Sequence, residues 1–142
     1  MIENLHLVTY FNYIAMNNTI CWRSRKQNCV ATSTVEAEYL ALSFTSKQQL
    51  WLQSALKELG LSIIPSALST DNEGTVDLVQ NPRISDRSKH IDIAYHHVRD
   101  LVETGKLTVL HVPGADNLAD ICTKALPGPR FRQLKEAVLG MR

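Results

Sequence analysis

The stretch "TSTVEAEYLAL", Thr32 to Leu42, opens the longest helix expected in this chain and sets two glutamates two residues apart. Ser33 followed three residues later by Glu36 is the pattern of a capping box, which satisfies backbone N–H groups at a helix start. The helical pattern can continue to Gly60, a residue type typical of the position just after a helix end. We therefore expect one helix that begins near Ser33 and ends before Gly60.

The two glutamates are predicted to lie on different sides of this helix, because successive residues rotate by about 100° and these two are about 200° apart. The polar side, with Glu36, also carries Ser43, Lys47, Ser54 and Glu58. The apolar side, with Glu38, carries Val35, Ala41, Leu42, Leu52 and Leu56. An ionised carboxylate on an apolar face is costly unless it is paired or binds a metal. Either Glu38 has such a role, or it stays hydrated near a helix start that favours acids.

The rest of the chain alternates predicted strands and helices. A hairpin is expected between Leu7 and Val30, with its turn at "MNNT". Then follow a strand near 67–70, a helix starting at Asp71 or Asn72 and stopping at Pro82, a helix ending at Gly105, a strand in "KLTVLHV", and helical structure from Asn117 that breaks at "PGP" and ends in a helix over 131–142. This order predicts one α/β domain over residues 1–142.

Composition limits the expected cellular location of the protein but identifies no binding partner. A net charge of +1 shows no global basic excess, so any nucleic-acid site must be local. The three cysteines form no CxxC pair, which argues against a disulfide framework. No apolar run approaches the length that spans a membrane, and "MIENLH" does not resemble a secretory signal. We expect a cytoplasmic or nuclear protein that is not secreted and has no membrane partner.

Two aspartates have positions that fit both a functional and a structural role. Asp71 follows the apolar stretch "SALST", at the end of a strand, where α/β sheets gather ligands. It would equally serve as a helix N-cap. Asp120 lies in the first helical turn after Asn117, where an acid also stabilises the helix dipole. Each acid alone leaves both interpretations open.

Four blocks together resemble the ribonuclease H region at the end of Ty1/copia-type retrotransposon polyproteins, over about residues 11–130. They are "WRSRKQNCVATSTVEAEYLAL", "TDNEGTVDLVQNP", "SKHIDIAYHHVRDLV" and "VPGADNLADICTKALPG". The resemblance implies an α/β fold with a ribonuclease H-like mixed sheet flanked by helices. It also implies Mg²⁺-dependent hydrolysis of RNA in RNA/DNA hybrids, with Mn²⁺ as a substitute metal. By motif, the catalytic metal ligands are Glu38, Asp71 and Asp120, although Cys122 stands where the family often has Leu.

This chain departs from the family pattern at its N-terminal end. The family carries its first catalytic aspartate on the first, central strand, well upstream of the residue that matches Phe11. Here only ten residues precede Phe11, and Glu3 is their only acid. Residues 2–8 would form a replacement strand with Glu3 as ligand, or a second copy or an upstream polyprotein fragment would fill the gap, or the chain is a relic. We expect the central strand to be missing or replaced, the chain to be a homo-oligomer through the exposed sheet region, and activity to be reduced or lost.

Basic residues near the second predicted strand are candidates for nucleic-acid binding. The run "WRSRKQ" places Trp22, Arg23, Arg25 and Lys26 where they would contact the phosphates of a hybrid duplex. A solvated strand end is the alternative. A second basic run comprises Arg83, Arg87 and Lys89, and the histidines lack the spacing of a zinc site. The competing function is a non-catalytic nucleic-acid-binding or protein-interaction module on the same scaffold.

Overall fold

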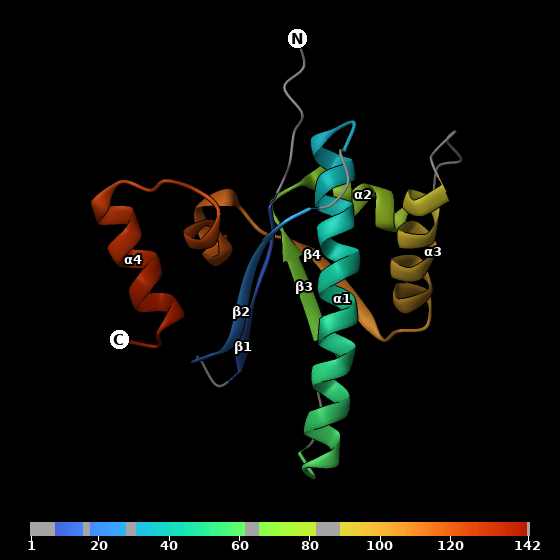
Figure 1. Cartoon of the computed structure of the whole chain (residues 1–142), viewed down its shortest axis with the longest axis horizontal. Coiled ribbons are helices and arrows are strands. Elements are labelled where there is room, and N and C mark those ends of the chain that lie inside the picture. The colour runs from blue at the N-terminus through green and yellow to red at the C-terminus, as the bar shows by residue number, and fades with distance from the viewer. Residues whose placement is uncertain (1–7, 16–17, 28–30, 62–65, 82–88, 142) are drawn as a thin grey trace.

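A computed structural model describes residues 8–15, 18–27, 31–61, 66–81 and 89–141. The strands are β1 (Val8–Ala15), β2 (Asn18–Lys26), β3 (Ser66–Thr70) and β4 (Leu107–His111). The helices are α1 (Thr34–Glu58), α2 (Glu73–Gln80), α3 (Lys89–Glu103) and α4 (Gly128–Val138), with 3₁₀ helices η1 (Gly114–Asp116) and η2 (Leu118–Cys122) before α4. Figure 1 shows this mixed α/β arrangement, with α1 as the longest element. The predicted fold class, α/β and ribonuclease H-like, is confirmed.

The ends of α1 form as the sequence predicts. Ser33 is the N-cap, and its side-chain oxygen accepts a hydrogen bond from the Glu36 backbone N–H at 3.1 Å. The Glu36 carboxylate accepts from the backbone N–H of Thr32, at 2.8 Å. Gly60 follows the helix with a φ of 76°, a conformation that favours glycine. Glu36 therefore stabilises the helix start.

The four described strands form two separate pairs. β1 and β2 are the predicted antiparallel hairpin, which runs from the Val8–Lys26 pair to the Ala15–Asn18 pair with one bulge. β3 and β4 are parallel, and the backbone N–H of Val112 extends their ladder by donating to the Thr70 carbonyl at 3.0 Å. Both pairs contact α1 (Figure 1). Among the described residues no strand joins β1 to β3, so the two pairs form separate two-stranded sheets there.

The core lies between α1, α3 and the β3–β4 pair. Its buried cluster comprises Tyr39, Leu42, Leu68, Leu78, Val79, Tyr95, Val98, Leu101, Leu107 and Val109. Tyr39 stacks on Tyr95 with ring centroids 5.4 Å apart and donates a hydrogen bond to its carbonyl at 3.2 Å. Assigning Ser43 to a polar face was wrong, because it is only 3% exposed. The buried arc of α1 is wider than predicted because the helix contacts β1, β3, α2 and α3.

The C-terminal part differs in detail from the prediction. The segment after Asn117 is a 3₁₀ helix, capped by the Asn117 side chain, which accepts from the Ala119 N–H at 3.2 Å. The last helix begins at Gly128 and ends at Val138, so the predicted bounds of 131–142 were wrong. The helix begins inside "PGP", earlier than predicted, because a proline such as Pro129 is tolerated in the first turn of a helix. In the described part of the chain, every helix is too short or too polar to cross a membrane.

Candidate active site

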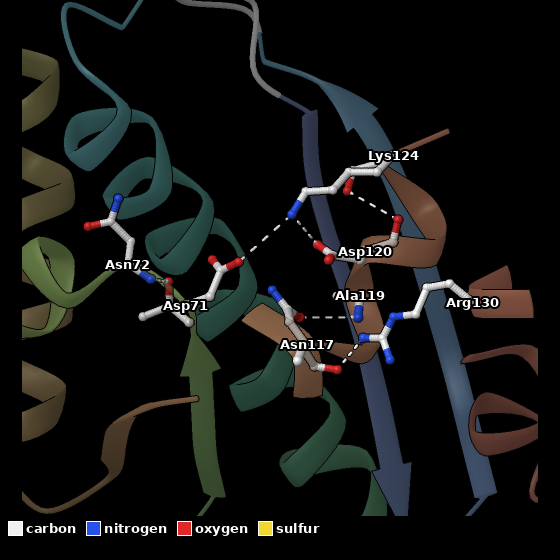
Figure 2. Close-up of polar contacts among 10 residues, drawn as sticks. Asp71, Asn72, Asn117, Ala119, Asp120, Lys124 and Arg130 are labelled. Atoms are coloured by element: carbon white, nitrogen blue, oxygen red, sulfur yellow. Dashed lines mark hydrogen bonds and ion pairs between the residues drawn. The ribbon is translucent and has the colours of Figure 1, made fainter. Parts of the chain in front are cut away.

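Three elements direct the predicted acids toward one region: the start of α1 carries Glu38, the end of β3 leads to Asp71, and η2 carries Asp120. The Asn72 side chain caps α2 by accepting a hydrogen bond from the Thr75 N–H at 3.0 Å. The alternative role of Asp71 as this cap is therefore wrong. Its carboxylate instead faces the segment that contains Asp120 (Figure 2).

Lys124 lies between two of these acids. Its Nζ is 2.7 Å from Asp120 Oδ1 and 3.9 Å from Asp71 Oδ2, as Figure 2 shows. The Lys124 backbone N–H also donates to the Asp120 carbonyl at 3.0 Å, which fixes the lysine backbone beside that acid. The Asp120 side chain is 9% exposed and the Lys124 side chain 55% exposed. The ammonium group thus reaches from solvent into the acidic region.

The charges of both aspartates and of the lysine affect the pKa of Glu38. Burial raises the pKa of the Glu38 carboxyl most strongly, and the negative charge of Asp71 raises it further. A hydrogen bond with the Thr70 side chain and the positive charge of Lys124 lower this pKa, while Asp120 raises it. Desolvation and like charges both disfavour an ionised carboxylate. The predicted acids therefore form one coupled electrostatic cluster, which we call the acidic cluster.

The 3₁₀ helix η1, which precedes η2, lies close to the acidic cluster. A side-chain carbon added at Gly114 would lie 3.6 Å from Asp71 Oδ2, so this glycine brings the backbone close to the carboxylate. The Arg130 guanidinium, from α4, donates a hydrogen bond to the Ala115 carbonyl (Figure 2). On the hairpin side, the Ser24 hydroxyl donates to the Cys122 carbonyl at 3.3 Å. These contacts position η2 and hence Asp120.

Sequence reasoning missed Lys124 and Arg130. Lys124 carried a readable signal, because an acid and a lysine four residues apart are neighbours on a helical turn. Its second contact, to Asp71, joins residues more than fifty positions apart and depends on the fold. No sequence pattern identified Arg130, because its guanidinium binds the backbone carbonyl of Ala115, and any residue type supplies such a carbonyl.

The chemistry of the acidic cluster suits a hard divalent cation. Carboxylate oxygens are the ligands that Mg²⁺ and Mn²⁺ prefer. Across the described ranges, however, no three Asp, Glu, His or Cys side chains lie close enough to hold a metal as they stand. The ammonium of Lys124 lies between Asp71 and Asp120 instead. The carboxylate donors therefore suit a divalent cation by their chemistry, and two of them, Asp71 and Asp120, already share one cation, the Lys124 ammonium.

The predicted nucleic-acid residues are exposed but do not share one face. Trp22, Arg23, Arg25 and Lys26 are all exposed on β2. Arg23 lies over the Phe44 ring of α1, 5.4 Å from its centroid. Because strand side chains alternate, Arg25 is placed with Arg23 on the α1 side, and Trp22 and Lys26 on the opposite side, toward η2. Alternation therefore divides the four residues between two faces of β2, and their role in nucleic-acid binding stays a prediction.

Several predicted residues lie outside what the structure describes. Glu3, Arg83 and Arg87 fall in undescribed segments, and the side chain of Lys89 is likewise undescribed. Their predicted roles stay predictions.

Comparisons with known proteins relate the chain to retrotransposon polyproteins. It is 38% identical over 137 residues, 96% of its length, to the retrovirus-related Pol polyprotein from transposon TNT 1-94 of Nicotiana tabacum. It is 38% identical over 130 residues, 91% of its length, to the corresponding polyprotein from transposon RE1 of Arabidopsis thaliana. It is 29% identical over 123 residues, 86% of its length, to the transposon Ty1-DR5 Gag-Pol polyprotein of Saccharomyces cerevisiae.

The chain spans 10%, 9% and 7% of the length of these three relatives, respectively. No family model matches it, and no solved structure matches it. The similarity covers most of the chain and supports a domain derived from a Ty1/copia-type retrotransposon Pol polyprotein.

Proposed function

We propose that this retrotransposon-derived domain is a ribonuclease H-type domain whose ancestral reaction is Mg²⁺-dependent hydrolysis of RNA in RNA/DNA hybrids. The observation that carries the proposal is the acidic cluster. Glu38, Asp71 and Asp120 come from three separate elements and influence one another electrostatically. A partly buried group of like charges is costly, and binding a cation is a physical reason for it.

In this proposal the three carboxylates hold the metal, and the metal supplies an activated water and stabilises the leaving oxygen. Mn²⁺ would substitute for Mg²⁺. Of the predicted nucleic-acid residues, Trp22 and Lys26 lie on the strand face that points toward η2, so they would contact the hybrid near the acidic cluster. Arg23 and Arg25 would contact it from the α1 side.

We further propose that catalytic activity is reduced or lost. The sequence has no aspartate before Asp71, and Glu3 is the only acid before Glu36. A two-metal site built from carboxylates needs enough of them to neutralise two divalent cations. Three carboxylates with a lysine among them supply a net charge of about −2 when all four groups are ionised.

The second candidate is a non-catalytic nucleic-acid-binding or protein-interaction module. It is favoured by the ion pairs of Lys124, which already neutralise part of the acidic cluster. It is also favoured by the sheet, whose β1 and β3 pair with only one strand each in the described part. Unpaired strand edges tend to pair with another chain.

We propose that a second copy of the chain covers these edges and forms a homo-oligomer. An upstream fragment of the polyprotein is the alternative source of the strand. Light scattering at micromolar concentration is expected to give at least twice the 15.9 kDa mass of one chain. A monomeric mass would exclude the second copy at that concentration and leave the polyprotein fragment as the candidate.

Cleavage of an end-labelled RNA/DNA hybrid, in Mg²⁺ and then in Mn²⁺, tests the proposed reaction. The variants are Glu38→Gln and Asp71→Asn, with Glu36→Gln as the matched control on the same helix. Residual cleavage by wild type and Glu36→Gln, abolished in the other two, would support catalysis by the acidic cluster. A silent wild type that still binds the hybrid would favour the non-catalytic module. A chain that neither cuts nor binds the hybrid would contradict both nucleic-acid functions.

A further inference from the structure

Lys124 is built into the acidic cluster. Its Nζ lies 2.7 Å from Asp120 and 3.9 Å from Asp71, so one ammonium group contacts two of the three acids. Its positive charge also lowers the pKa of Glu38, against the effects of burial and of the two aspartates. Lys124 is therefore the counter-charge of the whole cluster.

The backbone of Lys124 is held in place, whereas most of its side chain is exposed to solvent. The backbone N–H donates to the Asp120 carbonyl at 3.0 Å, which holds the Cα next to the cluster. The side chain is 55% exposed, whereas Asp120 is 9% exposed. A lysine side chain has four rotatable carbons and an ammonium group that hydrates readily. It can therefore leave the acids without unfolding η2.

A divalent cation bound between Asp71 and Asp120 would compete with this ammonium group for the same pair of carboxylates. A metal between Asp71 and Asp120 would lie at ligand distance from the oxygens that Lys124 contacts, and cations at such separations repel strongly. We therefore expect metal binding to displace Lys124 from the pair.

We propose that Lys124 is an internal cation that competes with the divalent metal for Asp71 and Asp120 and so sets the metal affinity of the cluster. This inference rests on the proposed function, because it assumes that the cluster binds a divalent cation. Displaced from the acids, the ammonium stays beside the cluster and is available to an anionic phosphate of the nucleic acid. The lysine thereby links metal binding to substrate binding.

Metal binding without substrate tests this directly, with free Mn²⁺ measured by electron paramagnetic resonance during titration of the whole chain. Lys124→Met keeps the length of the side chain and removes the charge. Lys135→Met, an exposed lysine on α4, is the matched control for loss of one positive charge. We expect Lys124→Met to bind Mn²⁺ about tenfold more tightly than wild type, and Lys135→Met to bind as wild type does.

A thermal melt without metal checks that each variant folds, and Lys124→Gln replaces Lys124→Met if the latter does not. Binding in the variant alone, with none in wild type, would also support the proposal. Equal Mn²⁺ affinity in wild type and variant would overturn the role of Lys124 while leaving the metal site intact. If neither binds Mn²⁺, both this inference and the metal site of the proposed function fail.

Discussion

Helix α4, which contacts the segment that carries Asp120, is buried through one leucine. Leu134 is 2% exposed and is the buried residue of α4, yet it lies outside the main core cluster. α4 contacts η2, which carries Asp120, and the Thr19 hydroxyl ties its end to the hairpin by donating to the Val138 carbonyl. Truncation of Leu134 to alanine should therefore loosen η2 and α4 while the main core stays folded.

The size of this effect follows from the atoms removed. Leu134→Ala deletes three carbons, worth about 0.8 kcal/mol each when buried, or about 2.4 kcal/mol. The cavity left behind raises the loss to about 3–4 kcal/mol. α4 has 11 residues, and an isolated helix of that length is marginal in water. We thus expect the detached form of α4 to become several hundredfold more populated, on the order of 150- to 800-fold.

Hydrogen exchange followed by mass spectrometry measures this population segment by segment. Amide protection should fall several hundredfold, on the order of 150- to 800-fold, in α4 and η2 and stay unchanged in the core of α1 and β3. Leu139→Ala is the matched control, because Leu139 is 54% exposed at the end of the same helix. That variant should change protection by no more than about twofold. If protection in Leu134→Ala falls equally in α1 and α4, then α4 and η2 do not open separately from the core. If protection does not fall at all, burial of Leu134 does not stabilise α4.

Three further predictions concern exposed rings, a titrating acid and a glycine. Trp22→Ala should weaken hybrid binding in a gel shift by about 1 kcal/mol, whereas Trp51→Ala, also 67% exposed but on α1, should leave it unchanged. Glu38→Gln should be more stable than wild type at pH 7 in urea unfolding. The raised pKa of Glu38 means that the native state binds the proton more tightly, so wild-type stability falls as pH rises from 4.5 through that pKa, and the two proteins should converge at lower pH. Gly74→Ala should lose about 1 kcal/mol, because the new methyl would lie 2.9 Å from a side-chain carbon of α1, whereas Gly128→Ala meets only a guanidinium nitrogen at 3.8 Å and should be neutral.

The local parts of the fold were readable from the sequence. Ser33 and Gly60 marked the ends of α1 because caps depend on a few neighbouring residues. The helical period separated Glu36 from Glu38, and the structure uses the first for the helix start and places the second among the acids. For the same reason, the hairpin and the β3–α2 unit were predicted near their observed bounds.

What the sequence left undetermined depends on packing between distant segments. Ser43 is buried because several elements surround α1, which no pattern within the helix reveals. The basic residues of β2 were grouped by their closeness in sequence, while the pleat of the strand sends them to opposite faces. The contact of Lys124 with Asp71 likewise needs the fold to bring two segments together.

The separation of the two strand pairs bears on whether the acidic cluster needs a further ligand from another chain. The capped start of α1 positions Glu38, and the turn between Thr70 and the Asn72 cap positions Asp71. Asp120 is positioned by the Asn117 cap together with the contacts of η2 to β2 and α4. None of these contacts passes through a central strand. A missing strand would therefore remove a ligand without scattering the other three. If a second copy or a polyprotein fragment supplies a carboxylate between β1 and β3, hybrid cleavage should rise while the fold of the three-acid cluster stays the same, and cleavage that stays absent in a proven complex would assign the chain to the non-catalytic class.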